Sequence, residues 1–173
     1  PSEALMGCSW NKDLMFELGR SMGAEADKTA IDGWYAPGVN LHRNAYLGRN
    51  YEYYSEDGVL SGKLAAKVIY GAKTNGLTCY LKHFVSSDSG DNPRGTDTWM
   101  TEQNLRENVL KPFEIAVKEG GANGIMSAFN DLGSIWCGAN YALLTEILRD
   151  EWGFRGVVIT DWTDTSNRGS MSI

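Results

Sequence analysis

The chain has 173 residues, of which 42% are hydrophobic and 22% charged, an ordinary composition for a globular protein. Its net charge of -6 argues against nucleic acid or an anionic membrane as a partner, because both attract basic surfaces. No run is long and apolar enough to cross a bilayer, and no basic-then-apolar signal segment opens the sequence.

Four segments with apolar residues at helical spacing alternate with four short apolar runs that are typical of buried strands. In chain order the predicted elements are helix 11–30, strand 33–41, helix 55–76, strand 77–84, helix 101–121, strand 123–130, helix 141–152 and strand 156–162. This alternation predicts an α/β protein with a parallel sheet covered by helices.

Individual residues mark the ends and the buried faces of these helices. Asn11 is a candidate N-cap, Gly76 a candidate stop, and Pro112 a kink or break. Helix 11–30 carries Leu14, Leu18, Met22 and Ala26 at helical spacing, and helix 55–76 a predicted buried stripe of Leu64, Val68 and Ala72. The pattern fits either an open doubly wound sheet or a (β/α)₈ barrel, and no glycine-rich phosphate motif follows a strand.

Polar side chains close each predicted strand. They are Asn40, His42 and Arg43 with Arg49 and Glu52 close behind, then Lys82 and His83, then Asn130, and finally Asp161 and Trp162. Both architectures place ligands at the carboxyl ends of strands, so we expect a polar pocket with an acidic centre there. Each residue alone has a structural alternative; Asp161 could cap a helix. Adjacent Lys82 and His83 should point to opposite faces unless the backbone is irregular.

These segments resemble glycoside hydrolase family 3, the β-glucosidase and β-xylosidase group. Residues 36–57, "APGVNLHRNAYLGRNYEYYSED", are similar to the family's "APGVNIHRNPLGGRNFEYFSEDP". Residues 80–84 ("YLKHF"), 124–130 ("GIMSAFN") and 143–162 ("LLTEILRDEWGFRGVVITDW") are similar to three further family motifs in the right order. The resemblance covers nearly all of the chain.

The resemblance implies a retaining, exo-acting β-glycosidase with Asp161 as the nucleophile. Arg49, Lys82 and His83 would then hydrogen-bond the sugar in the cleaved subsite, and Trp162 would stack beyond the scissile bond. Such enzymes use two carboxylates about 5 Å apart, the second as acid/base. Lys82, Arg49 and a charged His83 would favour the ionised nucleophile.

Two further positions follow from the same resemblance. Arg94 matches a loop arginine of the family if "SGDNPR" carries about one extra residue. Phe129 stands where the family commonly has Tyr, so either a hydrogen bond to the nucleophile would be missing or the chain would belong to a subgroup that uses Phe or Met there. The loop after residue 83 has no second histidine, which argues against the β-N-acetylglucosaminidase branch.

The resemblance also implies that residues 1–173 are an internal part of the catalytic (β/α)₈ domain, since such a barrel runs to about 250 residues. The acid/base residue and the remaining barrel strands would come from elsewhere in the same or another chain, and residues 163–173 would form an active-site loop. The glutamates at 102, 107, 114, 146 and 151 are predicted to lie on solvated helix faces. Alone, these residues are expected to be inactive.

The substrate is expected to be a β-linked oligosaccharide or glycoside, with glucose as the favoured terminal sugar and xylose as the alternative. A non-catalytic carbohydrate-binding or scaffold remnant, and a Schiff base on Lys82, are rival interpretations. No metal or cofactor is expected. The distant cysteines Cys8, Cys79 and Cys137 indicate reduced thiols, and with the missing signal segment they predict a cytoplasmic location.

Overall fold

The computed structural model describes residues 1–88 and 94–162. The predicted active-site loop 163–173 and the "SGDNP" part of the loop before Arg94 lie outside the described residues.

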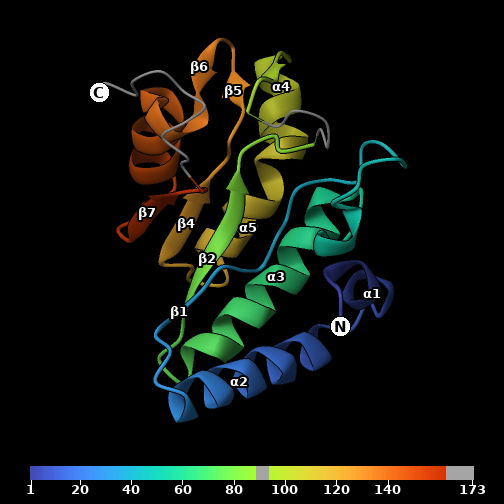
Figure 1. The fold of residues 1–173 in the computed structure, drawn as a ribbon, viewed down its shortest axis with the longest axis vertical. Helices are drawn as coiled ribbons and strands as arrows, with labels where there is room; N and C mark the ends of the chain where they lie inside the picture. The colour runs from blue at the N-terminus through green and yellow to red at the C-terminus, as the bar shows by residue number, and fades with distance from the viewer. Residues whose placement is uncertain (89–93, 163–173) are drawn as a thin grey trace.

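A four-stranded parallel sheet organises the molecule (Figure 1). Its strands, in spatial order, are β1 (Gly33–Trp34), β2 (Thr78–Phe84), β4 (Gly124–Ser127) and β7 (Val157–Thr160). The spatial order of these four strands is the same as their order along the chain, and each neighbouring pair is parallel. The order never reverses as in a doubly wound sheet, so the fold is a partial (β/α)₈ barrel.

Helices precede and connect these strands. They are α1 (Glu3–Cys8), α2 (Lys12–Lys28), the 3₁₀ turn η1 (Asn50–Glu52), α3 (Gly58–Lys73), α4 (Glu102–Asn104), the π-helix η2 (Leu105–Val109), α5 (Lys111–Lys118), the 3₁₀ turn η3 (Cys137–Ala139) and the π-helix η4 (Ala142–Glu151). Asn11 caps α2 by accepting two backbone N–H groups, as predicted. Pro112 stands at the start of α5, where the predicted helix 101–121 breaks.

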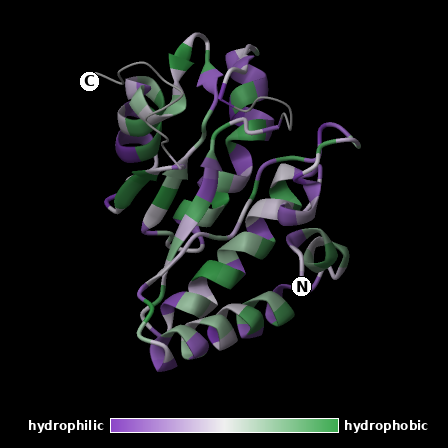
Figure 2. Cartoon of the chain, in the orientation of Figure 1, coloured by the Kyte–Doolittle hydropathy of each residue, from purple (hydrophilic) through white to green (hydrophobic). Residues whose placement is uncertain are grey.

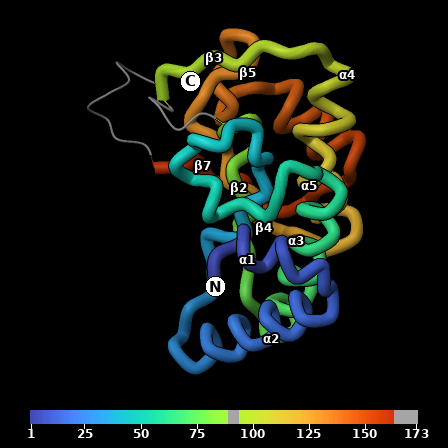
Figure 3. The backbone as a smooth tube through the Cα atoms, turned by 90° about the vertical axis from the view of Figure 1, so that its right-hand side faces the viewer, coloured from blue at the N-terminus to red at the C-terminus, as the bar shows by residue number. Residues whose placement is uncertain are grey.

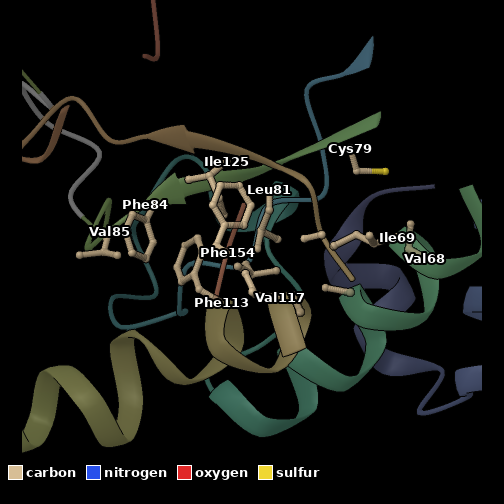
Figure 4. Close-up of a cluster of buried hydrophobic side chains, with 14 of the residues drawn as sticks. Val68, Ile69, Cys79, Leu81, Phe84, Val85, Phe113, Val117, Ile125 and Phe154 are labelled. Atoms are coloured by element: carbon tan, nitrogen blue, oxygen red, sulfur yellow. The ribbon is translucent and has the colours of Figure 1, made fainter. Parts of the chain in front are cut away.

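The core lies between the sheet and helices α3 and α5 (Figure 4). Leu81 and Ile125, from neighbouring strands, pack with Phe113 and Val117 of α5, and the Phe84 and Phe113 rings meet edge to face at 5.2 Å. Burying each such side chain contributes about 1.5–3 kcal/mol. The predicted stripe of α3, Leu64, Val68 and Ala72, is fully buried. Figure 2 shows hydrophobic and hydrophilic residues alternating around the helices.

Helices α2 and α3 pack backbone against backbone. A Cβ atom added at Gly19 would overlap the Val68 carbonyl, and one added at Gly71 would overlap that of Phe16. The buried face of α2 therefore consists of Met15, Gly19, Gly23 and Ala26, while Leu14 is 50% exposed. The periodicity of the large apolar residues missed this face because two of its four members are glycines.

A second, smaller sheet was not predicted. It contains β3 (Asp97–Thr98), β5 (Asp131–Leu132) and β6 (Ile135–Trp136), and Asp97 accepts hydrogen bonds from the Ser134 backbone and hydroxyl in the β5–β6 turn. Figures 1 and 3 both place it at the opposite end of the molecule from α2, beyond the carboxyl ends of the long strands. Two-residue strands are too short to leave a periodic pattern.

The face of the sheet turned away from the helices carries Tyr80. Its ring lies across the strands on both sides, close enough to Gly33 and Gly124 that a Cβ at either position would approach it to 3.0 Å. The ring also meets Tyr35 edge-on at 5.6 Å. On the edge strand β7, Val157 is 56% exposed. This face is therefore apolar and partly open.

Candidate active site

The loop after β1 leads the chain along the carboxyl end of β2. Only Gly33–Trp34 of the predicted strand 33–41 forms a regular strand, and Pro37, which has no N–H to donate to a ladder, interrupts the rest. The chain then returns to the sheet at an isolated bridge between Gly38 and Lys82. The polar residues of this loop that follow Gly38 are thereby brought beside β2.

The end of β2 is irregular. The ladder to β4 shifts register between Leu81 and Phe84, and the Lys82–His83 peptide is cis. Asn40 holds this stretch by donating to the His83 carbonyl at 3.0 Å and accepting the His83 N–H at 2.7 Å. Because the backbone is irregular here, the side chains of Lys82 and His83 do not follow the alternation of a regular strand. Both contact the same polar cluster.

Four predicted site residues from three different strand ends meet in this cluster. Arg49 Nη2 donates to His83 Nε2 at 2.8 Å, and His83 Nε2 lies 3.5 Å from Asp161 Oδ2. Lys82 Nζ and Arg49 Nε both bind the carboxylate of Glu52, the former at 3.1 Å. Since consecutive parallel strands end at one edge, the chain folds these distant residues into a single polar site.

His83 is neutral, contrary to the prediction of a charged ring. Burial and the neighbouring cations Arg49 and Lys82 hold the pKa of His83 well below its usual value. Arg49 can only donate, so Nε2 is the acceptor and Nδ1 carries the proton. Nδ1 donates to the Tyr53 hydroxyl at 3.2 Å, which in turn faces the Ser87 carbonyl at 3.5 Å. Because its Nε2 carries no proton, His83 forms no ion pair with Asp161.

Asp161 is fixed by the backbone. Its N–H donates to the Ser127 carbonyl at 3.2 Å, and its Oδ1 accepts the Trp162 N–H at 2.7 Å. Burial raises the pKa of Asp161; Arg49 and Lys82 act in the opposite direction, as predicted, but do not reverse it. The negative charge of Glu52 further raises the pKa.

Glu52 is central to the cluster, although no motif marks it as a site residue. It is 9% exposed, and one carboxylate oxygen faces each of Arg49 and Lys82. Burial alone would raise the pKa of Glu52, but the hydrogen bonds and charges of these two cations outweigh burial and lower the pKa. An ionised, doubly paired carboxylate cannot serve as a general acid.

Arg94, Phe129 and Trp162 form the outer part of the site. The Arg94 guanidinium lies 4.9 Å from the centre of the Phe129 ring, within cation–π range, and donates to the Trp162 carbonyl at 3.4 Å. The Trp162 side chain is 74% exposed. The arginine of one loop is thus linked to the ends of β4 and β7, and an open aromatic plate lies beside Asp161.

The helix glutamates lie away from this cluster. Arg106 joins Glu102 to Glu151, and Glu114 is paired with Lys111 and Lys118. The side chains of Glu102, Glu107, Glu146 and Glu151 are exposed, as predicted, and Glu114 is half-buried. These ion pairs join helix residues to one another, not to the cluster around Asp161.

Three further features concern the described residues, 1–88 and 94–162. No group of three or more His, Cys, Asp or Glu side chains is arranged to hold a metal ion. None of the helices there has the length and apolarity needed to traverse a bilayer. Cys8 and Cys79 are free thiols; Cys8 is exposed, whereas Cys79 and Cys137 are buried.

Comparison with known proteins identifies the family. Residues 1–171 match the Glycosyl hydrolase family 3 N terminal domain, so the chain belongs to this family. The chain is 41% identical over 162 residues to Beta-glucosidase A of Butyrivibrio fibrisolvens, covering 94% of this chain and 20% of that protein. It is 35% identical to Exo-alpha-(1->6)-L-arabinopyranosidase of Bifidobacterium breve, covering 98% and 22%. These matches confirm the resemblance seen in the motifs.

A solved structure agrees. Beta-glucosidase 3B from Thermotoga neapolitana in complex with glycerol superposes with a TM-score of 0.92 at 43% identity, over 94% of this chain and 23% of that one. The chain spans about a fifth of the length of the curated relatives it matches.

Proposed function

We propose that this chain supplies the nucleophile half of a retaining, exo-acting β-glucosidase. The supporting observation is the placement of Asp161 at a strand end, within one cluster of Arg49, Lys82 and His83. Sugars present many hydroxyls and an apolar face, which charged donors and an aromatic plate such as Trp162 suit. Residues 1–173 then form part of the catalytic (β/α)₈ domain.

In the proposed reaction Asp161 attacks the anomeric carbon of a terminal β-linked sugar. A second carboxyl group, about 5 Å away, protonates the leaving oxygen and later activates water to hydrolyse the glycosyl-enzyme. That residue, and the strands that complete the barrel, come from outside the described residues, in the same or another polypeptide. Asp161 must be ionised to attack, and Arg49 and Lys82 act in that direction.

The donors have separate proposed tasks. Arg49 and Lys82 are cations already oriented by Glu52, and would grip sugar hydroxyls through charge-assisted hydrogen bonds. His83, neutral and held by Asn40, would accept a hydrogen bond from another hydroxyl at Nε2 in place of Arg49 Nη2, since its Nδ1 is bonded to Tyr53. Arg94 and Phe129 would border the sugar, with Trp162 stacking beyond the scissile bond. The pairing of Lys82 with Glu52 uses its ammonium group, which disfavours the Schiff-base alternative.

Trapping of the glycosyl-enzyme tests this proposal. A 2-deoxy-2-fluoro β-glucoside, applied to the polypeptide that naturally contains these residues, should inactivate it and add one fluoroglucosyl group to the peptide holding Asp161. Mass spectrometry of the digest identifies the labelled residue. Asp161→Asn should abolish labelling and lower kcat by at least about 10³-fold, the scale of loss for an essential reacting group.

The same assay separates the alternatives. Comparing aryl β-glucoside, aryl β-xyloside and aryl α-L-arabinopyranoside ranks the terminal sugar, since one relative is named for the last of these. Sugar binding without labelling or turnover would instead favour the non-catalytic carbohydrate-binding interpretation. Label on any residue other than Asp161 would contradict the proposed mechanism.

A further inference from the structure

We propose that Glu52 is a positioning residue, which holds Arg49 and Lys82 in the geometry needed to grip the sugar. This inference rests on the proposed function and deepens it. Glu52 lies in η1, in the loop that follows β1, whereas Lys82 lies near the end of β2. One carboxylate therefore ties together donors from two consecutive βα units.

The contacts leave Glu52 little freedom. Oε1 pairs with Arg49 Nε, Oε2 lies 3.1 Å from Lys82 Nζ, and its own N–H donates to the Arg49 carbonyl at 3.0 Å. The Lys82 side chain is 17% exposed and that of Glu52 12%, so solvent screens this pair only in part. Both oxygens are thus used, which is the arrangement expected of a clamp rather than of a reacting carboxylate.

The orientation that Glu52 imposes on Arg49 also affects His83, which Arg49 contacts. With Nε directed at Glu52, the guanidinium presents Nη2 to His83 Nε2 at 2.8 Å. This donation selects the tautomer in which Nδ1 carries the proton and donates to Tyr53. Glu52 therefore acts on three substrate-gripping side chains, two directly and His83 through Arg49.

Charge balance gives the inference a distinctive signature. Two cations, Arg49 and Lys82, face two carboxylates, Glu52 and Asp161. Because the negative charge of Glu52 raises the pKa of Asp161, removing that charge should lower it. Asp161 would then stay ionised to lower pH, so the acid limb of the kcat/KM profile should move to lower pH.

The test uses Glu52→Gln in the polypeptide that naturally contains these residues, with Glu56→Gln as the control, because Glu56 is an exposed carboxylate of the same loop. For Glu52→Gln we expect kcat/KM to fall by about 10²-fold, the cost of misplacing a binding group by about 1 Å. The acid limb should move to lower pH. Glu56→Gln should match the wild type in both respects.

Glu52→Asp keeps the charge but shortens the reach. It should lose kcat/KM while its acid limb stays at the wild-type pH, and it covers the case in which Glu52→Gln fails to fold. An acid limb unmoved in Glu52→Gln, or a kcat/KM within twofold of wild type, would overturn the inference.

One readout does not depend on turnover. The ¹⁵N shifts of the His83 ring report its tautomer, which should be the Nδ1–H form in the wild type and become mixed in Glu52→Gln. If the wild type hydrolyses no glycoside, the proposed function fails, while this measurement still decides the role of Glu52. An unchanged tautomer in Glu52→Gln would count against it.

Discussion

Asp88, at the end of the described part of the loop after β2, is a buried carboxylate outside the proposed chemistry. The nearest cation, Arg43, lies 3.6 Å away, which is beyond hydrogen-bonding range. Burial raises the pKa of Asp88 from its ordinary 3.8 to about 6, with Arg43 opposing this rise. At neutral pH the folded protein therefore holds a buried negative charge that Arg43 and the Leu41 backbone compensate only in part.

This shift predicts a pH-dependent effect of Asp88→Asn. Between pH 3.8 and about 6 the folded state binds more protons than the unfolded state. The free energy of unfolding of the protein with Asp88 therefore falls as the pH rises through this range. The gap of about 2 units corresponds to at most about 3 kcal/mol. Asp88→Asn should thus stabilise the protein at pH 7.5 and have little effect at pH 4, as measured by denaturant unfolding. An equal change at both pH values would refute the assignment.

At the scale of single residues, the motifs predicted which residues form the cluster but not which of them contact one another. Arg49, Lys82, His83 and Asp161 were all expected at strand ends, and the structure brings them together. Glu52 follows Arg49 by three residues, a spacing that equally suits an ordinary surface ion pair. Its second partner, Lys82, comes from the next βα unit, a contact that only the fold creates. The neutral state of His83 depends on its burial, which cannot be inferred from the neighbouring residues in the sequence.

At the scale of elements, the contact between α2 and α3 depends on the absence of side chains. Gly19→Ala should push these helices apart and destabilise the protein by about 1–3 kcal/mol, because the new methyl would overlap the Val68 carbonyl. Thermal unfolding of the variant measures this. Gly48→Ala is the matched control: a Cβ there has nothing within 4 Å, so the change should be close to neutral.

If Gly19→Ala and Gly48→Ala had the same effect, close packing would not explain the glycines of α2.

The periodic pattern predicted all four long helical segments and the four strands of the main sheet, because each buries a continuous face. It missed α1 and the β3–β5–β6 sheet, which are short. It also missed the true buried face of α2, where glycines replace large apolar residues.

At the scale of the whole molecule, the sheet ends at two edges within the described residues. Among the described strands β1 and β7 each pair on one side only, and the face bearing Tyr80 and Val157 is partly open. Unpaired edges and open apolar faces favour association. The alternation of helical and strand segments predicted an α/β fold and the family resemblance a partial barrel, while periodicity alone left an open sheet as an alternative that the spatial order of the strands excludes.

Residues 1–173 produced alone are therefore expected to self-associate or stay partly unfolded, and to hydrolyse no aryl β-glucoside. Light scattering after size exclusion, with a turnover assay on the same fractions, checks both expectations. A monodisperse 19.1 kDa monomer with a cooperative thermal transition would contradict the structural part. Measurable turnover would mean that the acid/base residue lies within this segment.

The position of Asp161 just after an edge strand has a consequence for the order of assembly. Its backbone is anchored to β4 through Ser127 and, within the described residues, has no strand on its other side. Asp161 is therefore held from one side only until a neighbouring strand is in place. On the proposed function, catalytic competence is therefore acquired late in folding and lost early in unfolding. Turnover would report the integrity of the closed barrel more sensitively than any spectroscopic signal from the core.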